Sequence, residues 1–126
     1  MSWSGSTTWR QAPNMADIAA VQHIIEPFAA GLRRLYGGRL RQVLVFGSYA
    51  RGEGSHHSDI DVAVLLDDFD DVCAELDRMG DLIWEVCLEH DTLLAVVPVR
   101  EADWRDGGEP LLRNLRREGV PAWTPT

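Results

Sequence analysis

Two aspartates separated by one residue, Asp59 and Asp61, are the residues of this chain best suited to chemistry. They open an apolar run to Leu66 that is typical of a strand buried on both faces. Because side chains alternate along a strand, both carboxylates would point to one face, roughly 6.6 Å apart. Their repulsion and lost solvation are relieved by a divalent cation. Oxygen-only ligands favour Mg²⁺ or Mn²⁺ over zinc, so the pair predicts a metal site.

The residues at the end of the preceding apolar run are suited to bind a phosphate. Gly47 allows the backbone to approach a ligand closely, and Ser48 offers a hydroxyl and an N–H group. If residues 48–52 begin a helical turn, its free N–H groups face the same place. The guanidinium of Arg51, one turn later, can reach a phosphate oxygen. Together with the two aspartates, these residues predict a site for a metal–triphosphate.

The segments 47–52 (GSYARG) and 58–62 (SDIDV) resemble the signature of the minimal, MNT-type nucleotidyltransferases, the short members of the DNA polymerase β-like superfamily. The resemblance extends from about Leu35 to Val99. It implies that Gly47 and Ser48 hold the phosphates of a nucleotide. It also implies that Asp59 and Asp61 bind two Mg²⁺ ions.

Members of this family usually carry a third carboxylate on the next core strand, where it helps a metal ion to activate the attacking hydroxyl. The best position here is Asp91, immediately before the apolar run that starts at Thr92. Glu89 is an alternative of equal standing. If neither residue serves, nucleotide binding could survive without catalysis.

The resemblance also implies a reaction and a partner. It implies Mg²⁺-dependent transfer of a nucleoside monophosphate, AMP from ATP, to a hydroxyl group. The acceptor it implies is a tyrosine of a HEPN-type helical toxin, which gives the chain an antitoxin role. Two alternatives stay open: an inactive module of the same fold that binds nucleotide or partner, and an adenylyltransferase that modifies a small molecule such as an antibiotic.

The elements that must position these residues follow from hydrophobic periodicity. An apolar stripe at helical spacing runs from Asp17 to the pair Gly37-Gly38, with a kink or break at Pro27. The remaining pattern predicts strands over residues 41–46, 59–66 and 92–99 (the last closed by Pro98), a loop over 50–58, and helices after Asp71 and over 109–118. The second helix has its expected stripe at Val72, Leu76, Met79, Ile83 and Val86, and the last helix turns Leu111, Leu112 and Leu115 inward.

This order predicts an α+β fold, a small mixed β-sheet of three to four strands flanked by helices. The resemblance implies the polymerase β-like palm fold of nucleotidyltransferases. Residues 1–15 are polar and predict a flexible N-terminal arm, which leaves residues 16–126 as one nucleotidyltransferase domain.

Composition excludes several other classes of function. All 12 basic residues are arginine, and 20 acidic residues give a net charge of −8, so strong nucleic-acid binding is not expected. No segment reads as a signal peptide or a membrane span. Cys73 and Cys87 lie on one predicted helix, about 21 Å apart along its axis, and are expected to be buried, reduced thiols. These features predict a cytoplasmic protein.

Several residues have structural interpretations beside the functional ones. Asp59 and Asp61 can merely cap loops, and Arg51, His56 and His57 can be solvated loop residues. Tyr49 can stack on a base or pack on the first helix, and Trp84 is expected in the core. The acidic stretch 67–71 is expected to cap a helix. The cluster of Arg33, Arg34, Arg39 and Arg41 can contact a nucleotide, RNA or an acidic partner. Leu112 can contact a partner protein or a second copy of this chain.

Overall fold

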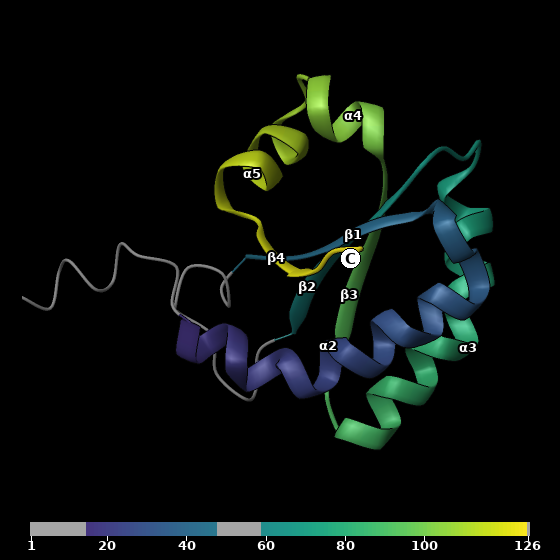
Figure 1. Ribbon diagram of the computed structural model, residues 1–126, viewed down its shortest axis with the longest axis vertical. Coiled ribbons are helices and arrows are strands. Elements are labelled where there is room, and N and C mark those ends of the chain that lie inside the picture. Colours follow the sequence, from purple (N-terminus) through teal and green to yellow (C-terminus); the bar gives the residue numbers. More distant parts are fainter. Residues whose placement is uncertain (1–14, 48–58, 126) are drawn as a thin grey trace, which may run out of the picture.

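The computed structural model describes residues 15–47 and 59–125, which form a four-stranded sheet with helices on both faces (Figure 1). The expected N-terminal arm lies outside the described residues except for Met15, which begins a helix. Also outside the described residues are the loop residues Ser48, Tyr49, Arg51, His56 and His57.

The sheet has the order β3-β2-β1-β4. Its strands are β1 (Leu40–Phe46), β2 (Ile60–Leu66), β3 (Leu94–Arg100) and β4 (Val120–Trp123). β1 is antiparallel to β2 and β4, whereas β2 is parallel to β3. The predicted mixed sheet of an α+β fold is therefore confirmed.

Alternate side chains of β2 enter two separate cores. Val62 and Val64 pack with residues of α2 (Met15–Tyr36) and α3 (Val72–His90). Ala63 and Leu65 pack with Leu112 and Leu115 of α5 (Pro110–Glu118). In Figure 1, α2 and α3 cover one face, and α5 lies on the other with the short α4 (Glu101–Asp106). The prediction that this strand is buried on both faces is confirmed.

α2 continues through Pro27 as one helix of 22 residues, so the expected break is absent. Pro27 is exposed, while Ile25 and Phe28 on either side of it are fully buried. Tertiary packing of this kind can outweigh the loss of a backbone hydrogen bond at proline. A 3₁₀ turn, η1 (Gly37–Arg39), then leads into β1.

α3 begins as predicted, with Asp71 accepting a hydrogen bond from the N–H of Cys73 at 2.9 Å. Of its expected stripe, Met79 and Val86 are buried and Ile83 is partly buried against the same core, and Glu75 is buried as well. Val72 is 45 % exposed and Trp84 is 66 % exposed, so their expected core positions are wrong. Trp84 is five residues after Met79, which rotates it by about 140° around the helix.

Three further expectations are corrected by the packing. β3 does not close at Pro98 but continues to Arg100, because an edge strand tolerates proline. Leu112 is buried and therefore not a surface contact, whereas Leu111, expected inside, is 40 % exposed. Cys73 is exposed, and both cysteines are free thiols on α3. None of the described helices is long and apolar enough to cross a membrane.

Candidate nucleotide-transfer site

The candidate site lies where the end of β1 meets the start of β2. These ends adjoin because the two strands are antiparallel, and Phe46 is paired with Asp61. The residue after β1 is Gly47, so the sheet itself brings the glycine turn to the aspartate pair. Two parts of the predicted site, 12 residues or more apart in the chain, are thus neighbours.

The Gly47 backbone and the Asp61 side chain are in direct contact. Gly47 has a φ of +72°, a conformation that disfavours side chains. A β-carbon on Gly47 would collide with Oδ2 of Asp61 and lie 3.1 Å from its Cγ. Only glycine therefore leaves room for the carboxylate, which is half-buried against the turn.

Asp59 is the exposed residue immediately before β2. Ile60 points into the core under α2 and α3, so Asp61 points to the other face of the sheet. By the same alternation, Asp59 belongs on the face of Asp61. The N–H of Ile60 donates to the carbonyl of Leu93 at 2.9 Å, which fixes this end of β2 beside β3.

The proposed third carboxylate does not lie on a strand. Asp91 is the exposed C-cap of α3, with a φ of 49°, and its N–H donates to the carbonyl of Cys87. The strand residue opposite Asp61 is Ala95. Glu89 is exposed in the last turn of α3. Within residues 15–47 and 59–125, no three acidic, histidine or cysteine side chains form a group that could hold a metal.

Glu118 is a carboxylate near this site that sequence reasoning missed. It ends α5, two residues before Val120, which pairs with Val45 of β1. The α5–β4 junction therefore lies beside the end of β1, close to Gly47. β4 was not expected from the sequence, because four residues that include Pro121 give no clear strand pattern.

Most of the expected arginine cluster has structural partners. Arg39 forms an ion pair with Asp67 at 3.0 Å, and this hydrogen bond lowers the pKa of the Asp67 carboxyl below its usual value. Arg41 lies 3.6 Å from Glu101, and Arg33 lies over the ring of Trp123 at 5.5 Å. Arg34 is exposed. These contacts favour a structural role for the cluster.

Comparison with solved structures supports the fold. A nucleotidyltransferase from Sulfolobus solfataricus superposes with a TM-score of 0.57 at 19 % identity, over 98 % of this chain and 92 % of that one. A toxin–antitoxin complex crystallised with AMP-PNP contains a chain with a TM-score of 0.53 at 26 % identity, over 78 % and 72 % of the two chains. An MntA–HpeT toxin–antitoxin complex gives 0.53 at 27 % identity, over 79 % and 72 %.

Comparison of sequences assigns the family. MJ0604 of Methanocaldococcus jannaschii, to which protein adenylyltransferase activity is ascribed, is 43 % identical over 73 residues, which are 55 % of this chain and 73 % of MJ0604. The family model for the nucleotidyltransferase domain matches residues 25–104, more than half of the chain. The match includes Gly47, Asp59 and Asp61. This chain therefore belongs to the nucleotidyltransferase domain family.

Proposed function

We propose that this nucleotidyltransferase transfers AMP from ATP to a tyrosine hydroxyl of a HEPN-type toxin and so acts as its antitoxin. The observation that carries the proposal is the contact between the Gly47 backbone and the Asp61 carboxylate. It joins a turn that a phosphate can approach to a carboxylate that can hold the metal ion of a nucleotide. Residues 16–126 would form the single domain that does this.

The relatives support the choice of nucleotide and acceptor. MJ0604 is described as an adenylyltransferase acting on protein, and one similar complex was crystallised with AMP-PNP, an analogue of ATP. The two similar complexes described above, at 26 % and 27 % identity, are toxin–antitoxin pairs.

The donor set of the site fits Mg²⁺. Asp59 and Asp61 offer only oxygen ligands, and Asp61 is held in place by the turn at Gly47. In this proposal Asp59 and Asp61 would hold two Mg²⁺ ions. Asp91, with Glu89 as the alternative, would be the third ligand and would have to approach this pair when the metal ions bind, because no three such side chains are grouped in the described residues. When bound, the metal ions neutralise charge on the triphosphate and favour loss of the acceptor proton.

The transfer itself is balanced as a substitution at the α-phosphorus. The acceptor oxygen forms a bond to the α-phosphorus, and the bond from this atom to the oxygen bridging to the β-phosphorus breaks. Pyrophosphate leaves with the bridging oxygen. The hydroxyl proton passes to a carboxylate, which we assign to Asp91, and then to solvent. Gly47, Ser48 and Arg51 would hold the β- and γ-phosphates in line for departure; Ser48 and Arg51 lie outside the described residues.

The test is transfer of radiolabel from α-labelled ATP. The purified chain is incubated with Mg²⁺ and a HEPN-type protein, and the label is followed by electrophoresis. We expect label on the partner from α-labelled ATP and none from γ-labelled ATP. Asp61→Asn should abolish labelling, whereas Asp81→Asn, which alters an exposed carboxylate of α3, should not.

Other outcomes contradict the proposal in distinct ways. Labelling that persists in Asp61→Asn would refute the role of this carboxylate. Label on an aminoglycoside hydroxyl, with none on the partner, would favour the small-molecule acceptor. Saturable ATP binding without any transfer would favour the inactive binding module.

A further inference from the structure

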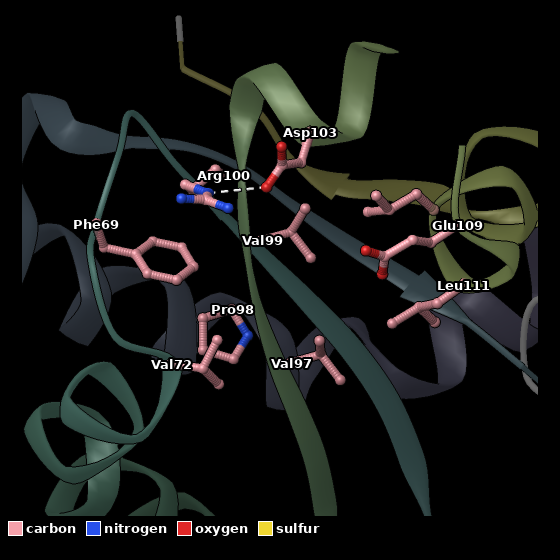
Figure 2. A pocket seen from close by; sticks show the side chains of 10 residues that line it. Phe69, Val72, Val97, Pro98, Val99, Arg100, Asp103, Glu109 and Leu111 are labelled. Atoms are coloured by element: carbon pink, nitrogen blue, oxygen red, sulfur yellow. Dashed lines mark hydrogen bonds and ion pairs between the residues drawn. The ribbon is translucent and has the colours of Figure 1, made fainter. Parts of the chain in front are cut away.

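A pocket of about 270 Å³ wraps around the outer edge of β3, the end strand of the sheet that the described residues form, on the C-terminal half of this strand (Figure 2). We call it the β3-edge pocket. One wall comes from the loop before α3 and the start of that helix, and the other from α5. Its lining residues are Phe69, Val72, Val97, Pro98, Val99, Arg100, Asp103, Glu109, Leu111 and Leu112.

The pocket presents apolar side chains to solvent on both walls. Val72 of α3 is 45 % exposed and Leu111 of α5 is 40 % exposed. Between them lies the half-buried side chain of Val97 on β3. Burial of such side chains by a partner would be favourable by about 25 cal/mol for each Å² removed from water.

The main chain of β3 also has hydrogen-bonding groups at this edge. The carbonyl of Leu93 accepts from the N–H of Ile60, so alternate residues after it (Ala95, Val97 and Val99) direct their N–H and C=O groups toward β2. Val96 and Pro98 consequently direct theirs away from the sheet. Pro98 has no N–H, so the edge offers both groups of Val96 and the carbonyl of Pro98. An extended segment can pair with such an edge.

The charges around the pocket are mainly negative. The Glu109 side chain is exposed, and its carboxylate points from α5 toward the space over β3 (Figure 2). In the part of the chain that the structure describes, this carboxylate has no hydrogen bond or ion pair. Asp103 is already paired with Arg100 at 2.8 Å, and Arg100 also lies over the Phe69 ring at 5.8 Å.

Two more carboxylates, Asp68 and Asp70, flank Phe69 and interact favourably with the positive charge of Arg100. The surroundings of the pocket therefore hold four carboxylates, Asp68, Asp70, Asp103 and Glu109, against the guanidinium of Arg100. A partner side chain that enters the pocket binds most favourably if it has an aliphatic stem, which contacts the apolar walls, and a cationic end, which is attracted by the carboxylates. Arginine and lysine have that construction.

We propose that the β3-edge pocket docks an extended segment of a partner protein, which places an arginine or lysine beside Glu109 and adds a strand to β3. A second copy of this chain is the poorer occupant. Two such edges would bring eight carboxylates together, and each chain has a net charge of −8. The complementary partner has a basic segment with apolar residues on both sides of the cation.

The pocket lies on the strand that also borders the candidate site. Ala95, opposite Asp61, precedes Val97 by two residues and Val99 by four, or about 7 and 13 Å along the strand. A segment paired with this edge would hold its own protein next to the site. The proposal goes beyond the transfer reaction and does not require it, because docking can be measured without nucleotide.

The test uses defined peptides and amide NMR spectra of the full chain. The probe is an acetylated, amidated pentapeptide Thr-Val-Arg-Val-Thr, and the matched control replaces its arginine with glutamate. We expect the arginine peptide to shift the amide signals of Val96, Val97 and Leu111 saturably, and the glutamate peptide to leave them unchanged. Glu109→Gln should weaken binding about three- to fivefold, as for a partly exposed ion pair.

A matched variant and a second substitution keep the test decisive. Glu85→Gln removes an exposed carboxylate of α3 outside the pocket and should bind the arginine peptide like the wild type. Leu111→Ala should weaken binding by removing an apolar wall. Equal binding of both peptides, shifts elsewhere, or no effect of Glu109→Gln would overturn the proposal.

Self-association is a separate outcome of the same spectra. Concentration-dependent shifts at Val96 and Val97 without peptide would identify a second copy of this chain as the occupant. They would also overturn the proposal that a segment of a different protein docks there. Peptide binding by a chain that transfers no label would refute the proposed transfer and leave docking intact. Transfer of label by a chain that does not bind the peptide would refute docking and leave the proposed transfer intact.

Discussion

The carboxylate of Asp61 lies against the α-carbon of Gly47, in the space where a side chain at that position would begin. Gly47 ends the β1 segment with a φ of +72°, and Asp61 belongs to the strand paired with β1. Backbone conformation and side-chain packing therefore require the same residue type at this position. A substitution at Gly47 tests both requirements together.

Gly47→Ala should lower the free energy of unfolding by about 1–3 kcal/mol, since it combines an unfavourable φ with a collision at Asp61. It should also reduce transfer of AMP strongly, because the carboxylate must move. Urea unfolding and the initial rate of pyrophosphate release measure the two effects. The matched control is Gly80→Ala in α3, where a β-carbon meets no heavy atom within 4 Å. This control should keep its activity and gain up to about 1 kcal/mol of stability from helix propensity. A fully active Gly47→Ala protein would contradict the importance of the contact.

Asp91→Asn should lower kcat about 100-fold if Asp91 supplies the third carboxylate. The substitution suits its backbone, because asparagine tolerates the left-handed conformation that Asp91 adopts at a φ of 49°. Thermal unfolding should therefore change little. Glu89→Gln, two residues earlier and also exposed, is the matched control and should keep the wild-type rate. A loss of kcat in Glu89→Gln but not in Asp91→Asn would identify Glu89 as the third carboxylate. If both variants keep the wild-type rate, Asp59 and Asp61 are the carboxylates of the site.

The sequence was most informative where local geometry decides the outcome. The uninterrupted apolar run to Leu66 predicted that Ala63 and its neighbours in β2 are buried on both faces, and this is confirmed. The position of Asp71 before an apolar periodic segment predicted the N-terminus of α3. The glycine turn and the two aspartates could be placed in one site because they flank adjacent strand ends.

Features that depend on tertiary packing could not be predicted in the same way. Pro98 reads as a strand terminator unless its strand is known to be an edge of the sheet. Trp84 reads as a core residue unless the rotation of α3 is known, and that rotation follows from the contacts of Met79 and Glu75. The position of Glu118 near the candidate site depends on β4, which gives no periodic signal over four residues.

Mg²⁺ together with AMP-PNP should raise the melting temperature of the wild-type chain, because a ligand that binds only the folded state stabilises it. At about 100 times the dissociation constant the gain is about 2.7 kcal/mol. EDTA should remove this gain, and Asp61→Asn should prevent it. Asp81→Asn, at an exposed position of α3, should respond like the wild type. An equal thermal shift in Asp61→Asn would place the metal or the nucleotide elsewhere.

Tyr36→Phe should lower the free energy of unfolding by about 1–2 kcal/mol. The Tyr36 hydroxyl donates a 2.8 Å hydrogen bond to Oε1 of Glu75, and both residues are buried between α2 and α3. Among the described residues, the Glu75 carboxylate then keeps the more distant guanidinium of Arg78, at 3.6 Å. Urea unfolding near neutral pH measures the loss. Leu35→Ala, next to Tyr36 but 43 % exposed, should change stability less, and a Tyr36→Phe protein as stable as the wild type would show that the hydrogen bond contributes nothing net.

Stability should also fall as the pH rises above about 10, the ordinary pKa of tyrosine. Burial, followed by the hydrogen bond to Glu75, raises the pKa of Tyr36 well above that value in the folded chain. Above pH 10 the unfolded chain therefore releases a proton that the folded chain retains, and the equilibrium shifts toward unfolding. Below pH 10 both states hold the proton, so the contribution of Tyr36 is fully present there. The measurement is the urea midpoint from pH 8 to 11 for the wild type and for Tyr36→Phe, which lacks the titrating group. The wild-type midpoint should fall more steeply, and parallel curves would refute the assignment to Tyr36.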